Sequence, residues 1–112
     1  MAVSQETIDY LVDQLSDFGS VIARRMFGGV GIFRDGLMFA LIGHGELYFK
    51  VDDGNRKDFE DAGMAPFRPY PDKDEIMPYY RVPADIVEDR EALKVWANKA
   101  YDVALRKKAA KR

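Results

Sequence analysis

Residues 24–51 restrict the possible folds of this chain more than any other segment, because short apolar runs alternate there with glycine-containing turns. Asp35-Gly36 lies between the runs 30–33 and 37–42, and both residue types tolerate the positive φ that a tight hairpin needs. A second, slightly longer turn over residues 43–46 precedes a third run. We therefore expect a three-stranded antiparallel meander, with the run 37–42 as its central and most buried strand.

Amphipathic helices are expected before and after this meander. Residues 5–18 repeat apolar side chains at helical spacing, with Ser4 as N-cap and Gly19 as the stop. Residues 21–27 mix apolar and basic side chains in a way compatible with a strand. A final helix is expected after Asp89 from the spacing of Leu93, Trp96, Ala97, Ala100, Tyr101 and Ala104.

A short helix over residues 55–62 is expected between the meander and the final helix, capped by Asp52 or Asp53. The following proline-rich stretch allows two extended pieces, around residues 67–70 and 77–82, which suit a sheet edge. The predicted fold class is α+β: two layers, an antiparallel sheet of about five strands packed with helices, in the order α-β-β-β-α-β-β-α.

The chain of 112 residues is 47% hydrophobic, which is enough to enclose one core but leaves little room for a second. We expect one domain over residues 1–112, with its core at about 5–105 and a basic tail at 106–112. The chain has no cysteine, which fits a reducing compartment and favours the cytoplasm. It shows neither the pattern of a secretory signal nor an apolar run of roughly 20 residues, so no membrane partner is expected.

The charge is divided unevenly along the sequence. Residues 1–105 hold 12 basic and all 19 acidic residues, for a net charge of 12 − 19 = −7, whereas the tail holds 5 cations. An acidic body suits nucleic acid poorly, because cationic contacts to phosphate supply most of that affinity. The favoured interpretation of the tail is a solvated helix end whose cations suit the helix dipole. Direct nucleic-acid binding through the tail remains an alternative.

No group of residues points to catalysis, a cofactor or a metal, and we expect a protein that is not an enzyme. His44 is the one histidine, and a hairpin tip flanked by glycines is a weak platform for a general base or a metal site. The glycine cluster at residues 27–31 runs into a strand rather than a helix, so a kink, a bulge or close backbone packing is favoured over phosphate binding.

Arginines and tyrosines are the candidate partner-binding residues. Arg24 and Arg25 should point to opposite faces of an extended strand, and one of them should have a specific partner. An ion pair with one of three carboxylates is the favoured structural interpretation; the candidates are Asp17, Glu60 and Asp61.

The dipeptide Tyr79-Tyr80 should place one ring in the core and the other outward as an interface anchor. Lys50 and Arg81 would join the same surface if the sheet brings them together.

Four separated motifs in this order resemble the N-terminal domain of TfoX/Sxy proteins over residues 8–104. They are Arg-Arg-Met-Phe-Gly-Gly-Val-Gly-Ile-Phe (24–33), Leu-Tyr-Phe-Lys-Val-Asp (47–52), Gly-Met-Ala-Pro-Phe (63–67) and Met-Pro-Tyr-Tyr-Arg-Val-Pro (77–83). The resemblance implies an α+β domain and a regulator of competence genes that acts with the cyclic-AMP receptor protein. Full-length regulators of this kind carry a further helical domain, absent from this sequence, and we expect a naturally short, stand-alone domain.

The leading functional hypothesis is a small interaction domain that contacts transcription machinery or a regulator through its sheet. One alternative is direct nucleic-acid binding. Another is a small-ligand or enzymatic domain with a pocket between sheet and helices, lined by Tyr79, Tyr80 and Arg25. An exposed edge strand in the proline-rich half would also allow a homodimer.

Overall fold

The computed structural model describes residues 3–26, 28–70 and 72–110. Phe27 and Pro71, together with the tail residues Lys111 and Arg112, lie outside the described residues, so the expectations placed on them are not addressed. The elements, in chain order, are α1 (Gln5–Gln14), η1 (Leu15–Asp17), β1 (Ile22–Met26), β2 (Gly29–Arg34), β3 (Leu37–Gly43), β4 (Glu46–Lys50), α2 (Arg56–Asp61), β5 (Pro66–Phe67), β6 (Met77–Arg81), α3 (Ala84–Glu88) and α4 (Arg90–Ala110).

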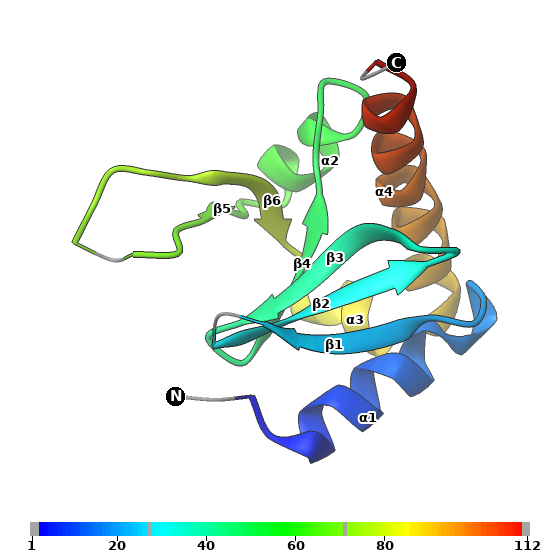
Figure 1. Ribbon diagram of the computed structural model, residues 1–112. Coiled ribbons are helices and arrows are strands. Elements are labelled where there is room, and N and C mark those ends of the chain that lie inside the picture. Colours follow the sequence, from blue (N-terminus) through cyan, green and yellow to red (C-terminus); the bar gives the residue numbers. More distant parts are fainter. Residues whose placement is uncertain (1–2, 27, 71, 111–112) are drawn as a thin grey trace.

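The strands form one antiparallel sheet in the order β1-β2-β3-β4-β6-β5, which confirms the predicted α+β class (Figure 1). The described part of the chain has six strands rather than about five, because residues 22–26 pair along their length with β2 and extend the meander to four strands. Strand β3 is an interior strand with its last five residues buried, as expected. The helix α3 was not predicted.

The hairpin turns between β2 and β3 and between β3 and β4 each have two residues. Asp35 and Gly36 have φ of 51° and 76°, and His44 and Gly45 have φ of 53° and 77°. Positive φ at both central residues matches the right-handed twist of the flanking strands. The turn between β3 and β4 is therefore tighter than predicted, and His44 occupies a position that glycine, asparagine or aspartate usually fills.

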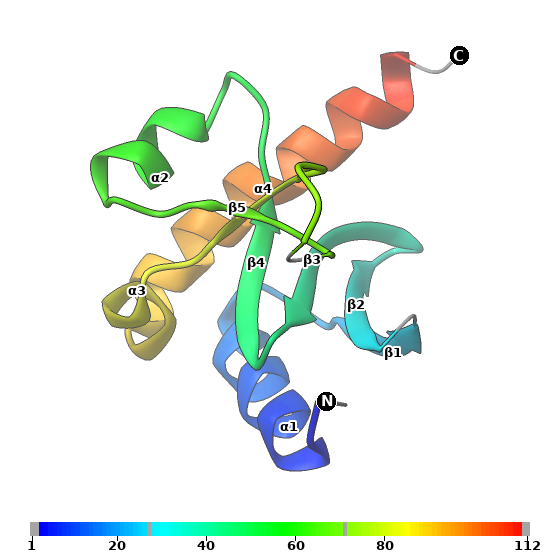
Figure 2. The same ribbon diagram turned by 90° about the vertical axis from the view of Figure 1, so that its left-hand side faces the viewer.

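The helices α1, α3 and α4 gather on one side of the sheet (Figures 1 and 2). Apolar side chains from α1, η1 and α4 meet the facing side chains of β2, β3 and β4 in one continuous core. Its fully enclosed members include Leu15, Ile32, Phe39, Phe49 and Leu93. Burial of such side chains from both layers holds the helices against the sheet.

The connection from β4 to α2 is ordered by an asparagine rather than by the predicted aspartate caps. Asn55 is 3% exposed; its Nδ2 donates to the carbonyl of Lys50 at 3.0 Å and its Oδ1 accepts from the N–H of Asp52 at 3.0 Å. A buried amide needs such partners, since burying it unsatisfied costs about 1–3 kcal/mol.

Candidate binding surface on the open face of the sheet

The second face of the sheet is not covered by the helices. Side chains of directly paired residues share one face, and a row of such pairs crosses five strands on the side away from the core. The row consists of Arg24, Gly31, Leu41, Tyr48 and Arg81. We call this side the open face. The long loop between β5 and β6 projects from its border (Figure 1).

Three glycines lie in the middle of the open face, where they let neighbouring groups approach the backbone closely. A Cβ on Gly43 would lie 2.5 Å from Cε1 of Phe67, and a Cβ on Gly31 would lie 3.1 Å from Cε of Met26. A Cβ on Gly29 would lie 2.8 Å from the carbonyl oxygen of Ile42. The glycine cluster therefore allows close packing, as predicted; the irregularity in the β2–β3 pairing lies beyond it, between Ile32 and Phe33.

These glycines form the floor of a cavity of about 260 Å³. Its larger apolar walls are Met26, Met38, Leu41, Phe67, Tyr70 and Met77. At the rim, His44 Nε2 lies 3.3 Å from the carbonyl oxygen of Arg68, and the His44 ring centroid lies 5.3 Å from that of Phe67. The histidine thus joins the β3–β4 turn to the chain that follows β5. We call this cavity the methionine hollow.

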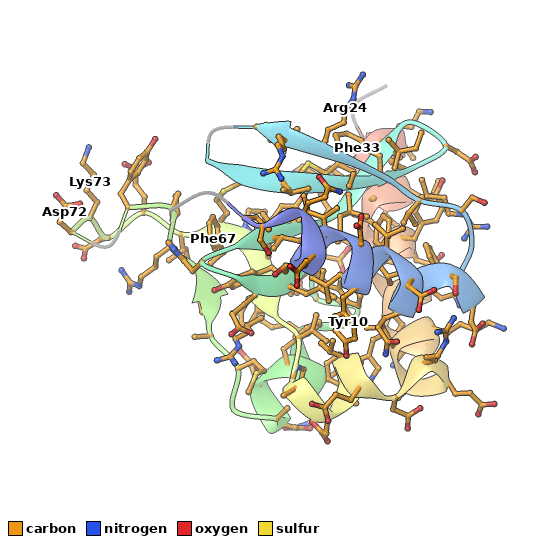
Figure 3. The ribbon with its side chains drawn as sticks, turned by 90° about the horizontal axis from the view of Figure 1, so that it is seen from below. Tyr10, Arg24, Phe33, Phe67, Asp72 and Lys73 are labelled. Atoms are coloured by element: carbon orange, nitrogen blue, oxygen red, sulfur yellow. The ribbon has the colours of Figure 1, made fainter. Side chains whose placement is uncertain are left out.

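Among the strand residues of the open face, cations outnumber anions. The charged ones are Arg24, Lys50, Arg81 and Glu46, a net charge of 3 − 1 = +2. The guanidinium of Arg24 lies 5.8 Å from the ring centroid of Phe33 and points away from the body of the molecule (Figure 3). Lys50 Nζ lies 5.4 Å from the ring centroid of Tyr79, and Arg81 pairs with Glu46 at 3.2 Å.

The structure divides the six predicted partner-binding residues between the two faces. Arg24, Lys50, Tyr79 and Arg81 lie on the open face, because the ladder pairs Tyr48 with Arg81 and Lys50 with Tyr79. Arg25 and Tyr80 alternate to the helix side. The six residues therefore do not form one surface, although four of them share a face.

The predicted ion pair of the arginines is wrong, although the expectation of a specific partner holds. Arg25 Nη1 donates to the carbonyl of Val3 at 2.7 Å. Two of the three candidate carboxylates pair elsewhere: Asp17 with Arg90 and Asp61 with Lys57. Arg25 thus fixes the segment before α1 to the edge strand, a structural task.

Neither tyrosine is an exposed anchor. Tyr79 is 4% exposed, and burial raises the pKa of its phenol to about 12. It belongs to a small cluster with Leu41 and Tyr48 that Phe67 partly covers. Tyr80 packs on the helix side, with its ring centroid 5.9 Å from that of Phe59. Tyr79 is therefore covered on the open face by the cluster around it, against which Phe67 of β5 packs.

Sequence reasoning missed the residues that line the hollow. Met26, Met38 and Met77 come from three different strands, Phe67 ends β5, and Tyr70 lies in the proline-containing loop that follows it. The sequence did hold a signal for this surface: methionines recur in and beside the glycine-containing strands, and methionine often lines adaptable binding surfaces.

A second hollow of about 380 Å³ lies between α1, α3 and the β3–β4 turn. Glu6, Glu46 and Glu88 rim it, and Tyr10 lines its wall, pointing away from Arg24 (Figure 3). The pocket predicted from Tyr79, Tyr80 and Arg25 corresponds to neither hollow of the described chain.

The basic tail is in part engaged. Arg106 Nε and Nη2 donate to the two carboxylate oxygens of Asp52 at 2.9 and 2.8 Å. This bidentate contact holds the pKa of Asp52 below its ordinary value and raises that of Arg106. Lys107 and Lys108 follow in the last turn of α4, where cations suit the helix dipole.

Within residues 3–26, 28–70 and 72–110, no group of three or more His, Cys, Asp and Glu side chains is arranged to hold a metal ion. None of the described helices has the length and apolar character needed to cross a bilayer.

Fold and open face define a small two-layer α+β domain with helices on one side of an antiparallel sheet and a shallow apolar hollow on the other. The family model of the TfoX N-terminal domain matches residues 13–104. The chain therefore belongs to the TfoX N-terminal domain family, as its motifs indicated. No curated protein matches it.

Proposed function

We propose that this chain is a non-enzymatic interaction domain that binds a protein partner through the open face of its sheet. The observation that carries the proposal is the methionine hollow, an apolar cavity on the uncovered face of the sheet, with Arg24 paired to Gly31 in its lining. Interfaces favour such a composition, with methionine, aromatic residues and arginine enriched. The setting we propose is the cytoplasm, and the partner is a component or regulator of the transcription machinery, in keeping with the family.

Direct nucleic-acid binding through the tail is the less favoured alternative, because Arg106 is committed to Asp52. Removing residues 106–112 would therefore also remove this contact with the body of the protein. The alternative predicts affinity that falls steeply with salt.

The proposal is tested by site-specific photo-crosslinking in cell lysate. A photoreactive amino acid replaces Ile22 in one variant and Val95 on α4 in the other. Ile22 is 64% exposed and lies two residues before Arg24 on the same face of β1, and Val95 is 54% exposed in the helix layer. We expect a discrete protein adduct from position 22 that survives nuclease treatment, and none from position 95. Equal adducts from both positions, none from position 22, or an adduct to nucleic acid would contradict the proposal.

A further inference from the structure

The methionine hollow and the charges beside it together specify the chemistry of a ligand. We infer, on the basis of the proposed function, that the partner presents an extended acidic segment. A bulky apolar side chain of that segment enters the methionine hollow, and an aspartate or glutamate close to it in sequence contacts Arg24.

The methionine hollow, at about 260 Å³, lies near the lower end of the roughly 300–1,000 Å³ typical of pockets for small molecules and cofactors, which suits a single inserted group. Its walls of methionine, leucine and aromatic rings suit one large apolar residue, because flexible thioether side chains adapt to the shape they receive.

The position of Arg24 fixes where the acid must be. Arg24 pairs across the strands with Gly31, which lies in the floor of the hollow, and Met26 projects from the same face of β1. The Cα atoms of residues paired in this way lie roughly 5 Å apart. An extended chain advances roughly 3.3 Å per residue, so a carboxylate within about three positions of the apolar anchor reaches the guanidinium.

Charge also favours an acidic segment over two other occupants of the open face, a second copy of the chain and nucleic acid. A second copy docking the same face across a two-fold axis would bring a net charge of +2 against itself, which is unfavourable. Nucleic acid needs several cations free to contact phosphates. Of the three cations on the strands of the open face, Arg81 is already paired with Glu46.

The inference is tested with random peptides displayed on phage and selected on the immobilised full chain. We expect enriched peptides to share a bulky apolar residue with Asp or Glu within about three positions. No enrichment, enrichment of Lys- or Arg-containing peptides, or enrichment of apolar peptides without acids would overturn it.

A synthetic peptide from the selection is then titrated by fluorescence anisotropy. Arg24→Glu should weaken binding about tenfold, because attraction becomes repulsion. Its matched control is Lys94→Glu, an exposed charge reversal on α4. Tyr70→Ser, which removes one wall of the hollow, should weaken binding about fivefold. Its control is Val95→Ser, since Tyr70 and Val95 are each 54% exposed.

We expect both controls to bind within about twofold of the unaltered chain, as surface changes outside the contact usually do. Unchanged affinity in Arg24→Glu or Tyr70→Ser would overturn the inference. Failure of the proposed function is distinguishable, because it appears as a missing protein adduct from position 22 in a variant that keeps Arg24. If that adduct forms but its cross-linked peptide lacks an acid beside an apolar residue, the inference fails and the proposed function stands.

Discussion

Tyr79 shows at the residue scale how burial changes the chemistry of a side chain. Its phenol is enclosed by the sheet and the β5 segment, and the raised pKa of about 12 reflects the cost of a buried phenolate. A group whose folded pKa lies above its ordinary value of 10.0 stabilises the fold at lower pH and loses that contribution as pH rises towards the folded value.

We therefore expect the free energy of unfolding of the unaltered chain to fall between pH 10 and pH 12, and to fall less in Tyr79→Phe. Urea denaturation at a series of alkaline pH values measures this slope. Identical slopes in the two proteins would show that ionisation of this phenol is not coupled to folding.

Gly43 is a second residue whose role depends on a contact distant in sequence. A Cβ there would lie 2.5 Å from Phe67, so the ring must move in Gly43→Ala. We expect a loss of about 1–3 kcal/mol in unfolding free energy, as in other overpacked sites.

The double variant Gly43→Ala with Phe67→Leu separates this clash from an intrinsic effect on the strand. We expect it to lose less stability than the sum of the single changes, because the smaller side chain leaves room for the methyl group. Chemical denaturation of all four proteins of this cycle provides the measurement, and strict additivity would argue against the clash.

At the scale of elements, the Asp52–Arg106 pair links the end of α4 to the connection between β4 and α2. Arg106→Gln should reduce the unfolding free energy by up to about 1 kcal/mol at neutral pH, because both side chains remain partly in water. Lys107→Gln is the control, since it removes a neighbouring cation of the last helical turn.

The pH dependence of this pair has a definite sign. Arg106 lowers the pKa of Asp52 below 3.8, so its contribution is present above that pH and is lost as the pH falls through the lower, folded value. Thermal denaturation at neutral and acidic pH should show the gap between Arg106→Gln and the unaltered chain closing in acid. A gap that persists would assign the effect to packing.

Local signals predicted most elements because their reasons are local. Ser4 caps α1 by accepting from the N–H of Thr7, and Asp89 accepts from the first N–H groups of α4, as side chains before helices do. The single-turn helix α3 was missed although Pro83 precedes it and Asp85 lies in its first turn. Five residues are too few to show an apolar periodicity.

At the scale of the whole molecule, one core cluster joins side chains from both ends of the domain, from Val3 to Ala104. We expect one cooperative unfolding transition, reported identically by Trp96 fluorescence and by far-ultraviolet circular dichroism. Phe39→Ala, at a fully buried site beneath the helices, should lower the unfolding free energy by about 3–5 kcal/mol without splitting the transition. Separate transitions for the two signals would contradict the single domain.

The sequence by itself determined the α+β class, the hairpin at Asp35-Gly36 and the two long amphipathic helices, because turn chemistry and periodicity act over a few residues. Only the tertiary structure decided which residues share the open face. Sheet pairing sends Arg24 and Arg25 to opposite sides, and it buries Tyr79 in a cluster with Leu41 and Tyr48. Met26, Met38 and Met77 meet in one hollow because strand order joins segments far apart along the chain, and that order depends on burying the whole core at once.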